Sequence, residues 1–251
     1  MSNWTNIDLI YLYDGTFEGF LTCIFDAFSK KQIPYLIKSS KEFTSSIFYS
    51  SLYAKTDFDK SSRVFNGILN LSDLVMYYTH NVFLSYHENK EILLLNYLIQ
   101  AFKYGPNINN MLTLNEVLTV QKISKTVTFE IQRLKGFVRF HEIKENLFFS
   151  EIEPDNNILE ILCEHFKKRL PSQNFMIYDS KRKLIGAYNT KELILTDCDN
   201  LPAIKISKTE KQYEEMWKMF FKTIAIKERT NSRLQRQYMP KRYWKHMLEN
   251  N

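Results

Sequence analysis

The pattern of apolar and polar positions divides the chain into four parts, of which the first is residues 1–62. Residues 7–13 are apolar at nearly every position, which is typical of a strand buried on both faces. Beyond a turn at Asp14-Gly15, apolar residues recur every three or four positions, and Thr16 is placed to cap a helix. We therefore predict a strand–turn–helix unit, followed by a second short strand at 35–37 and a loop.

The second part, residues 63–135, has the helical period throughout. A strongly apolar segment at 91–102 is followed by Gly105-Pro106, a pair that ends helices. Thr113 and Glu116 have the spacing of a capping box, which begins the next helix. This part is predicted to form three or four packed helices.

The third part, residues 136–206, changes to short segments typical of strands. Segments 137–143 and 147–152 flank a turn and predict a hairpin. A helix with Asn157 at its cap follows. Segments 175–179 and 184–188 are two more predicted strands, and segment 193–195 is a candidate third. The ββαββ order is typical of a helix laid on one face of an antiparallel sheet.

The fourth part, residues 207–251, begins with a long amphipathic helix that runs from about Thr209 to Met239-Pro240. Its apolar stripe must be buried against the rest of the protein. Arg229, Arg233 and Arg236 lie away from this stripe on the helical wheel. We therefore predict an α+β fold in a single domain (1–251), with a strand–helix unit, a central helical block, an antiparallel ββαββ-type sheet and a long C-terminal helix.

The fourth part also contains the chain's excess of positive charge. The chain has a formal net charge of +6, and the segment from Lys227 to Lys245 alone contains seven Lys or Arg and one acid. Aromatic residues are interleaved with these cations, a combination typical of phosphate binding with ring stacking on bases. The predicted nucleic-acid-binding residues of this segment are Arg229, Arg233, Arg236, Lys241, Arg242, Tyr243, Trp244 and Lys245. Two alternatives remain, a solvated helix face with a basic tail and a surface for an acidic partner protein.

Arg139 and His141 are a second pair of candidate nucleic-acid contacts. Strand alternation sends both side chains to the same face, where they would extend the basic surface if that face is open. The alternative is a face covered by a helix, with Arg139 paired to an acid such as Glu130 or Glu142.

Cysteine and hydropathy patterns exclude several classes of protein. Cys23, Cys163 and Cys198 are odd in number and widely spaced, and no Cys-x-x-Cys pair is present, so we expect reduced thiols, no metal and no cofactor. Cys163 is expected to be a buried thiol. The longest apolar stretch, 92–99, is much shorter than the ~20 residues of a spanning helix, and the start of the sequence lacks the basic residues of a signal peptide. A cytoplasmic protein without a membrane partner is therefore expected.

Several short motifs distributed along the chain identify a likeness to known sequences. They are residues 13–20 (YDGTFEGF), 83–85 (FLS), 130–140 (EIQRLKGFVRF), His165-Phe166 with Arg169, 177–182 (IYDSKR), 228–231 (ERTN) and 239–245 (MPKRYWK). Together they resemble, over nearly the whole chain, an uncharacterised bacterial family assigned to DNA repair or DNA metabolism. The resemblance implies a role beside a radical-SAM protein for DNA modification or repair.

Some members of that family are fused to a domain that resembles uracil-DNA glycosylase. This sequence has neither such a domain nor the three-cysteine motif of a radical-SAM enzyme, and the family supplies no catalytic residues. We therefore expect a DNA-binding accessory protein that acts with a radical-SAM partner. The alternatives are a DNA repair enzyme acting on damaged or single-stranded DNA, and an adaptor between proteins that never contacts DNA.

Overall fold

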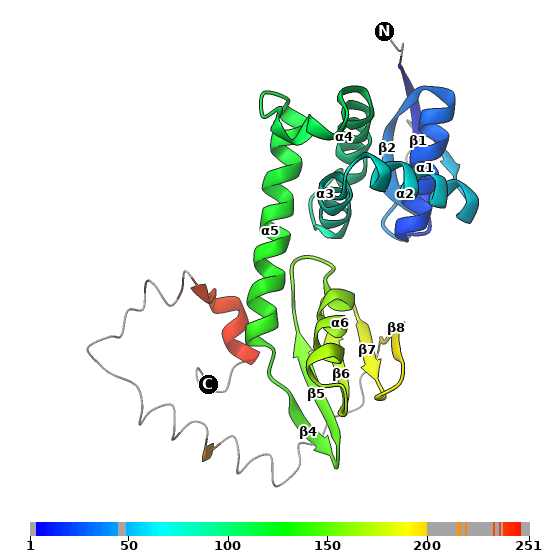
Figure 1. Ribbon diagram of the computed structural model, residues 1–251. Helices are drawn as coiled ribbons and strands as arrows, with labels where there is room; N and C mark the ends of the chain where they lie inside the picture. The colour runs from blue at the N-terminus through cyan, green and yellow to red at the C-terminus, as the bar shows by residue number, and fades with distance from the viewer. Residues whose placement is uncertain are drawn as a thin grey trace. The chain divides into compact units, whose positions relative to one another are not determined.

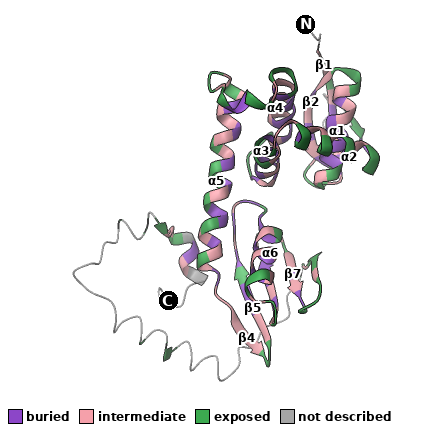
Figure 2. Ribbon diagram, viewed as in Figure 1, coloured by how far each residue is buried: buried purple, intermediate pink, exposed green. Residues whose placement is uncertain are grey.

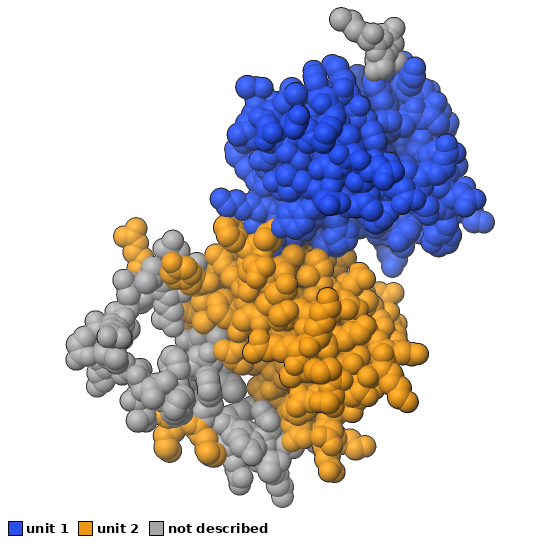
Figure 3. Space-filling view, in the orientation of Figure 1, with its two compact units in different colours: residues 1–127 blue, residues 128–251 orange. Residues whose placement is uncertain are grey.

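The computed structural model describes residues 4–44, 49–199, 215, 216, 219, 233, 236 and 238–246 (Figure 1). The side chains of residues 242, 245 and 246 are not part of this description. Both helices and sheets are present, which confirms the α+β class. Contacts between residues group the chain into two compact units, unit 1 (Met1–Val127) and unit 2 (Thr128–Asn251) (Figure 3), and the single domain expected from the sequence stays a prediction.

Unit 1 contains a parallel three-stranded sheet in the order β2-β1-β3. The strands are β1 (Thr5–Tyr13), β2 (Gln32–Ser39) and β3 (Ser50–Tyr53). The central place of β1 confirms the interior strand predicted from its continuous apolar run. The sequence predicts a loop where strand β3 lies, because the four residues of β3 show no apolar alternation. All four are exposed, and the strand pairs with β1.

The turn from β1 into α1 (Phe17–Lys30) is held by the Asp14 carboxylate. Its Oδ1 accepts the Thr16 amide at 2.9 Å and the Thr16 hydroxyl at 2.6 Å, and its Oδ2 accepts the Thr56 hydroxyl at 2.6 Å. Partial burial alone would raise the pKa of Asp14, but these hydrogen bonds outweigh it and hold the pKa below its ordinary value. Thr16 accepts the Gly19 amide, which confirms the predicted helix cap.

Four helices follow in the predicted helical block. They are α2 (Phe58–Leu71), α3 (Asp73–Leu84), α4 (Lys90–Tyr104) and α5 (Asn115–Phe137), with the 3-10 helix η1 (Pro106–Asn110) after α4. Helix α2 begins before the predicted start at residue 63, because Asp57 caps it by accepting the amides of Asp59 and Lys60 at 3.0 Å each. Helix α4 ends at Gly105 as predicted.

The core of unit 1 contains one buried polar pair among its apolar side chains. Glu91, 3 % exposed at the start of α4, accepts the hydroxyl of Tyr13 at 2.9 Å. Burial, and next the charge of Glu91, raise the pKa of Tyr13 above its ordinary value. Figure 2 shows buried residues in both α1 and α4, and in α1 every residue from Gly19 to Ile24 is buried.

Unit 2 contains a five-stranded sheet in the order β4-β5-β6-β7-β8. Its elements are β4 (His141–Lys144), β5 (Leu147–Ile152), α6 (Leu159–Arg169), β6 (Asn174–Asp179), β7 (Leu184–Tyr188) and β8 (Leu193–Asp197). The hairpin of β4 and β5 and the predicted ββαββ order are confirmed, and the candidate third strand after α6 is present as β8. The expectation of a wholly antiparallel sheet is wrong, since β5 and β6 are parallel. A strand–helix–strand crossover such as β5-α6-β6 brings its two strands into parallel pairing.

Two local predictions in unit 2 are also corrected. The strand predicted at 137–143 begins only at His141, because α5 continues to Phe137. Ile158, without a side-chain cap bond, occupies the N-cap of α6 in place of Asn157. Cys163 is fully buried as expected, and burial raises the pKa of its thiol to about 12, assisted by Glu164 and Glu160.

The predicted C-terminal helix lies mostly outside the described residues. Within it, Glu215, Met216, Met219, Arg233, Arg236 and Tyr238 are helical. The helix ends at Met239-Pro240 as predicted, and the 3-10 helix η3 (Lys241–His246) follows. None of the helices in the described part of the chain combines the length and apolar character needed to cross a bilayer.

Candidate nucleic-acid interface

The carboxylate of Glu130, on α5, joins three segments of unit 2. Its Oε2 accepts the backbone amide of Asn156 at 2.9 Å and the side-chain amide of Asn156 at 2.6 Å. Its Oε1 accepts the backbone amide of Asp155 at 3.0 Å and the hydroxyl of Tyr243 at 2.5 Å. Glu130 is only 3 % exposed, so these four donors replace the water that an ionised carboxylate loses on burial.

A second buried carboxylate fixes the loop that faces Glu130. Asp179, at the end of β6, is fully buried and accepts the backbone amides of Lys181 and Arg182 and the guanidinium of Arg182 at 2.9 Å. The same guanidinium donates to the carbonyl oxygens of Pro154 and Asp155. The backbone that offers its amides to Glu130 is thus held from its other side by Arg182.

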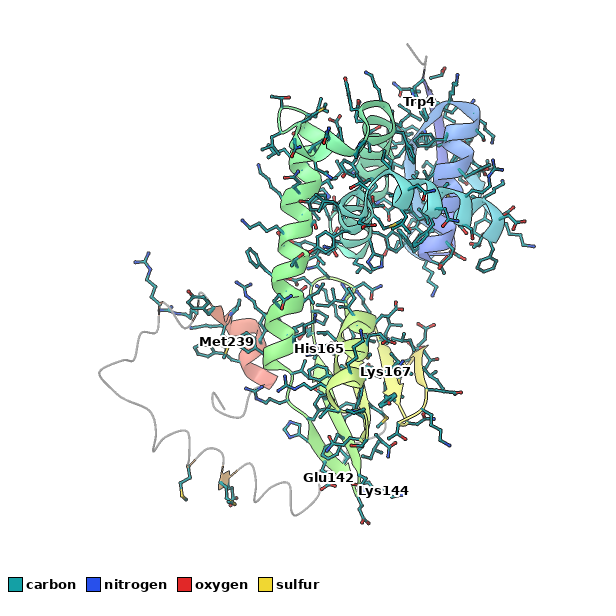
Figure 4. All side chains as sticks on the ribbon, in the orientation of Figure 1. Trp4, Glu142, Lys144, His165, Lys167 and Met239 are labelled. Atoms are coloured by element: carbon teal, nitrogen blue, oxygen red, sulfur yellow. The ribbon has the colours of Figure 1, made fainter. Side chains whose placement is uncertain are left out.

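The segment from Lys227 to Lys245 is called the basic segment below. Tyr243 attaches η3, which contains the end of the basic segment, to the rest of unit 2. The ring is 2 % exposed and η3 lies against β5. Figure 4 shows Met239 just before η3, beside α5. A ring so deeply buried has no face open to a base. We therefore correct the prediction that Tyr243 stacks on nucleic acid, and interpret it as the anchor of the basic segment.

Trp244 also has a contact inside the protein. It is half-buried, and its indole N–H donates to the carbonyl oxygen of Met239 at 3.0 Å. This bond joins η3 to Met239, the residue that follows the last helical position, Tyr238. The part of the ring that stays exposed is the part available to a ligand.

Three of the predicted cations of the basic segment are placed by the structure, and all three side chains are exposed: Arg233, Arg236 and Lys241. Arg229 and the side chains of Arg242 and Lys245 lie outside the described residues. Lys241 begins η3, which Tyr243 attaches to α5, and Arg236 and Arg233 lie five and eight positions before Lys241 in the sequence.

The other predicted pair, Arg139 and His141, is half-buried. The Arg139 guanidinium donates to the carbonyl oxygen of Gly136 at 2.9 Å and to that of Val138 at 3.4 Å. A cation in this position satisfies carbonyl groups at the end of α5 and is favoured by the helix dipole. Arg139 precedes β4 and His141 begins it, so strand alternation does not relate the two as predicted.

A further group of basic side chains was missed from the sequence. His165 on α6 lies close to Lys135 at the end of α5 and to Arg169 at the end of α6, and Figure 4 shows His165 and Lys167 on the same helix. Burial, and next the charges of Lys135 and Arg169, lower the pKa of His165. The sequence signal was present, since Lys135 and Arg169 both lie in the last turn of a helix, where cations are favoured.

The surplus charge of the chain belongs to unit 2. Residues 1–127 contain 11 Lys or Arg and 11 Asp or Glu, whereas residues 128–251 contain 23 and 17. Unit 1 is therefore neutral and unit 2 carries the whole +6. A surface of this sign attracts polyanions over the length of the Debye screening distance.

The next question is whether the described residues contain a set of side chains that could bind a metal ion. Across the described residues, three or more His, Cys, Asp or Glu side chains do not come together in a way that could hold a metal ion. The buried thiols Cys23 and Cys163 both have a pKa raised to about 12, chiefly by burial.

Comparison with protein families relates the chain to a known family model. The model of a family described as a domain of unknown function, DUF4130, matches residues 88–249, which is more than half of the chain. The match contains all of unit 2 that the structure describes and the helices α4 and α5 that precede it. No curated protein matches the sequence.

Proposed function

Because the chain belongs to the DUF4130 family, whose function is unknown, we propose its function from the charge and contacts of unit 2: it binds DNA as an accessory protein. The observation that carries the proposal is the confinement of the whole net charge of +6 to unit 2, where Arg233, Arg236 and Lys241 are exposed. Exposed cations on one unit bind phosphates and release the counterions of the nucleic acid.

The Glu130–Tyr243 hydrogen bond supports this proposal by giving the basic segment a fixed attachment. A disordered tail loses conformational entropy when it binds a ligand. A segment anchored at η3 has lost part of this entropy before binding, so ordering it opposes binding less. Lys135 and Arg169 add two cations on the ends of α5 and α6 in the same unit.

The proposal is tested by binding of fluorescent single- and double-stranded oligonucleotides over a series of salt concentrations. We expect affinity to fall steeply as salt rises, with a slope that counts the phosphates contacted. The variant Arg233→Glu with Arg236→Glu is expected to lose at least about tenfold in affinity at low salt and to give a shallower slope.

The matched control is Lys41→Glu with Lys55→Glu, which changes the net charge by the same amount at two exposed positions of unit 1. The control is expected to bind almost as well as the native chain. Equal losses in both variants would mean that only total charge matters. Unchanged affinity in the Arg233 and Arg236 variant would overturn the proposal.

The resemblance of the sequence motifs extends the proposal to a radical-SAM partner for DNA repair or modification. This extension is tested by co-purification of the two proteins with and without nuclease. A complex that survives nuclease supports direct contact between the proteins, and one that is lost indicates that DNA bridges them. The absence of any complex under both conditions would remove the partner from the proposal.

A further inference from the structure

Unit 1 has an open groove between α1 and α2, with a volume of about 550 Å³. Its lining includes Phe25 and Phe28 from α1, Val64 from α2 and Phe102 from α4. Gly67 gives the groove its depth, because this position of α2 has no side chain. A Cβ built on Gly67 would lie 3.6 Å from the ring of Phe102, an ordinary contact, so larger side chains there would enter the groove.

The lining of this groove is almost entirely apolar and aromatic. Phe102 is 42 % exposed, although an aromatic ring gains by being removed from water. Of the two polar side chains in the lining, Ser29 already donates its hydroxyl to the carbonyl oxygen of Asp26 at 3.0 Å, and the other is Arg63. The groove therefore suits an apolar group from outside the unit.

Arg63 adds a charge to the rim of the groove. Its guanidinium lies 5.2 Å from the centre of the Phe25 ring, a cation–π contact. Within the described residues no carboxylate lies at ion-pair distance from Arg63. Lys60, one turn earlier on α2, differs in this respect, because its ammonium is paired with Asp26 at 2.7 Å. Arg63 is thus the cation of this rim that is open to an acidic group.

We propose that this groove docks an amphipathic helical segment of an acidic partner protein. One large apolar side chain of the segment fills the space above Gly67 and beside Phe102. An Asp or Glu about one helical turn away pairs with Arg63. The match is between an apolar floor with an unpaired cation on this unit and an apolar stripe with an adjacent carboxylate on the partner.

A nucleobase fits the groove less well. An unpaired base has several donors and acceptors on its edge, and these need polar partners in the pocket that receives it. The groove offers them only Ser29 and Arg63. Unit 1 is also neutral, without the surplus of cations that contacts to phosphates require. The docking proposal is therefore independent of DNA binding by unit 2.

The test uses a phage-displayed library of random helical peptides selected on the full chain. We expect selected peptides to share a large apolar residue with an Asp or Glu one turn away. Their affinity is then measured for the variant Gly67→Leu, which fills the groove, and for Asn66→Leu, which adds the same side chain at the exposed neighbouring position. Gly67→Leu is expected to reduce affinity at least about tenfold, whereas Asn66→Leu leaves it unchanged.

A charge exchange tests the role of Arg63. The variant Arg63→Glu is expected to lose affinity, and a peptide whose acid is replaced by Lys is expected to recover it on this variant. Failure to select groove-dependent peptides would overturn the proposal, as would selected peptides without an acid. A single-stranded oligonucleotide whose binding falls in Gly67→Leu and not in Asn66→Leu would overturn it in favour of a nucleobase. DNA binding through unit 2 is measured on the same variants and should not change.

Discussion

Tyr243 donates its hydroxyl to Glu130 at 2.5 Å, joining two residues that lie 113 positions apart in the sequence. Both side chains are buried, with exposed fractions of 2 % and 3 %. The hydrogen bond therefore does two things in unit 2. It satisfies a carboxylate that has no access to water, and it fixes the end of the basic segment to α5.

Removal of the Tyr243 hydroxyl should destabilise the folded chain. The variant Tyr243→Phe keeps the ring and leaves Glu130 Oε1 with one donor fewer, so we expect the free energy of unfolding to fall by about 1–3 kcal/mol. Chemical denaturation monitored by fluorescence measures it. Tyr238→Phe is the control, since Tyr238 is exposed, and should change stability little. Equal stability of Tyr243→Phe and the native chain would show that this hydrogen bond does not contribute to the free energy of unfolding.

Gly186 and Cys163 are expected to be energetically coupled. A Cβ on Gly186 would overlap the sulfur of Cys163, so Gly186→Ala forces α6 away from β7 and should reduce the free energy of unfolding by about 1–3 kcal/mol. In a Cys163→Ala background the obstacle is gone, and the same substitution should cost less. Thermal or chemical unfolding of the four proteins of this cycle gives the coupling energy. Strictly additive losses would contradict the packing described.

The three thiols should differ in reactivity. Burial raises the pKa of Cys23 and Cys163 to about 12, whereas Cys198 is only half-buried. Because the thiolate is the reactive form, an aromatic disulfide reagent at pH 8 is expected to label Cys198 in the folded chain and all three in denaturant. Replacement of Cys198 by Ser should abolish the fast labelling. Fast labelling that persists in this variant would place Cys23 or Cys163 closer to solvent than the structure does.

Asp14 should make stability depend on acid pH. Its pKa is lowered in the folded chain from the ordinary 3.8, so its contribution is complete above about pH 3.8 and is lost as the pH falls through the lower, folded value. The variant Asp14→Asn lacks this ionisation. We expect it to be less stable than the native chain at neutral pH, with a difference that narrows below pH 3.8. A constant difference would mean that the charge of Asp14 contributes nothing.

Local sequence signals predicted much of this fold. The apolar run of β1, the cap at Thr16 and the stop at Gly105-Pro106 each depend on residues that are adjacent in the chain, and the structure confirms them. Strand β3 gave no such signal, because an exposed edge strand needs no apolar alternation. Strand order alone does not fix strand direction, and the sheet contains one parallel pair, β5 and β6, because α6 forms a crossover between them.

The candidate site was less predictable for a physical reason. Charge and helical period identify cations, but they do not show which side chains meet across long separations in sequence. Tyr243 was interpreted as a stacking residue from its basic neighbours, whereas its partner Glu130 lies on α5. Lys135 lies on α5 and Arg169 on α6, so the proximity of both charges to His165 depends on tertiary structure and not on spacing in the sequence.

His165 supplies a direct readout of these two cations. Burial, and next Lys135 and Arg169, hold its pKa below 6.5, so the unfolded chain takes up the proton more readily and stability should decrease as the pH falls through 6.5. Arg169→Gln removes one neighbouring charge and is expected to raise the pKa of His165, which NMR titration measures. DNA phosphates that contact Lys135 and Arg169 should raise it as well. Arg63→Gln, in unit 1, is the control and should leave the titration unchanged. Tight DNA binding with an unmoved His165 titration would exclude these cations from the interface and confine the phosphate contacts to other cations of the chain.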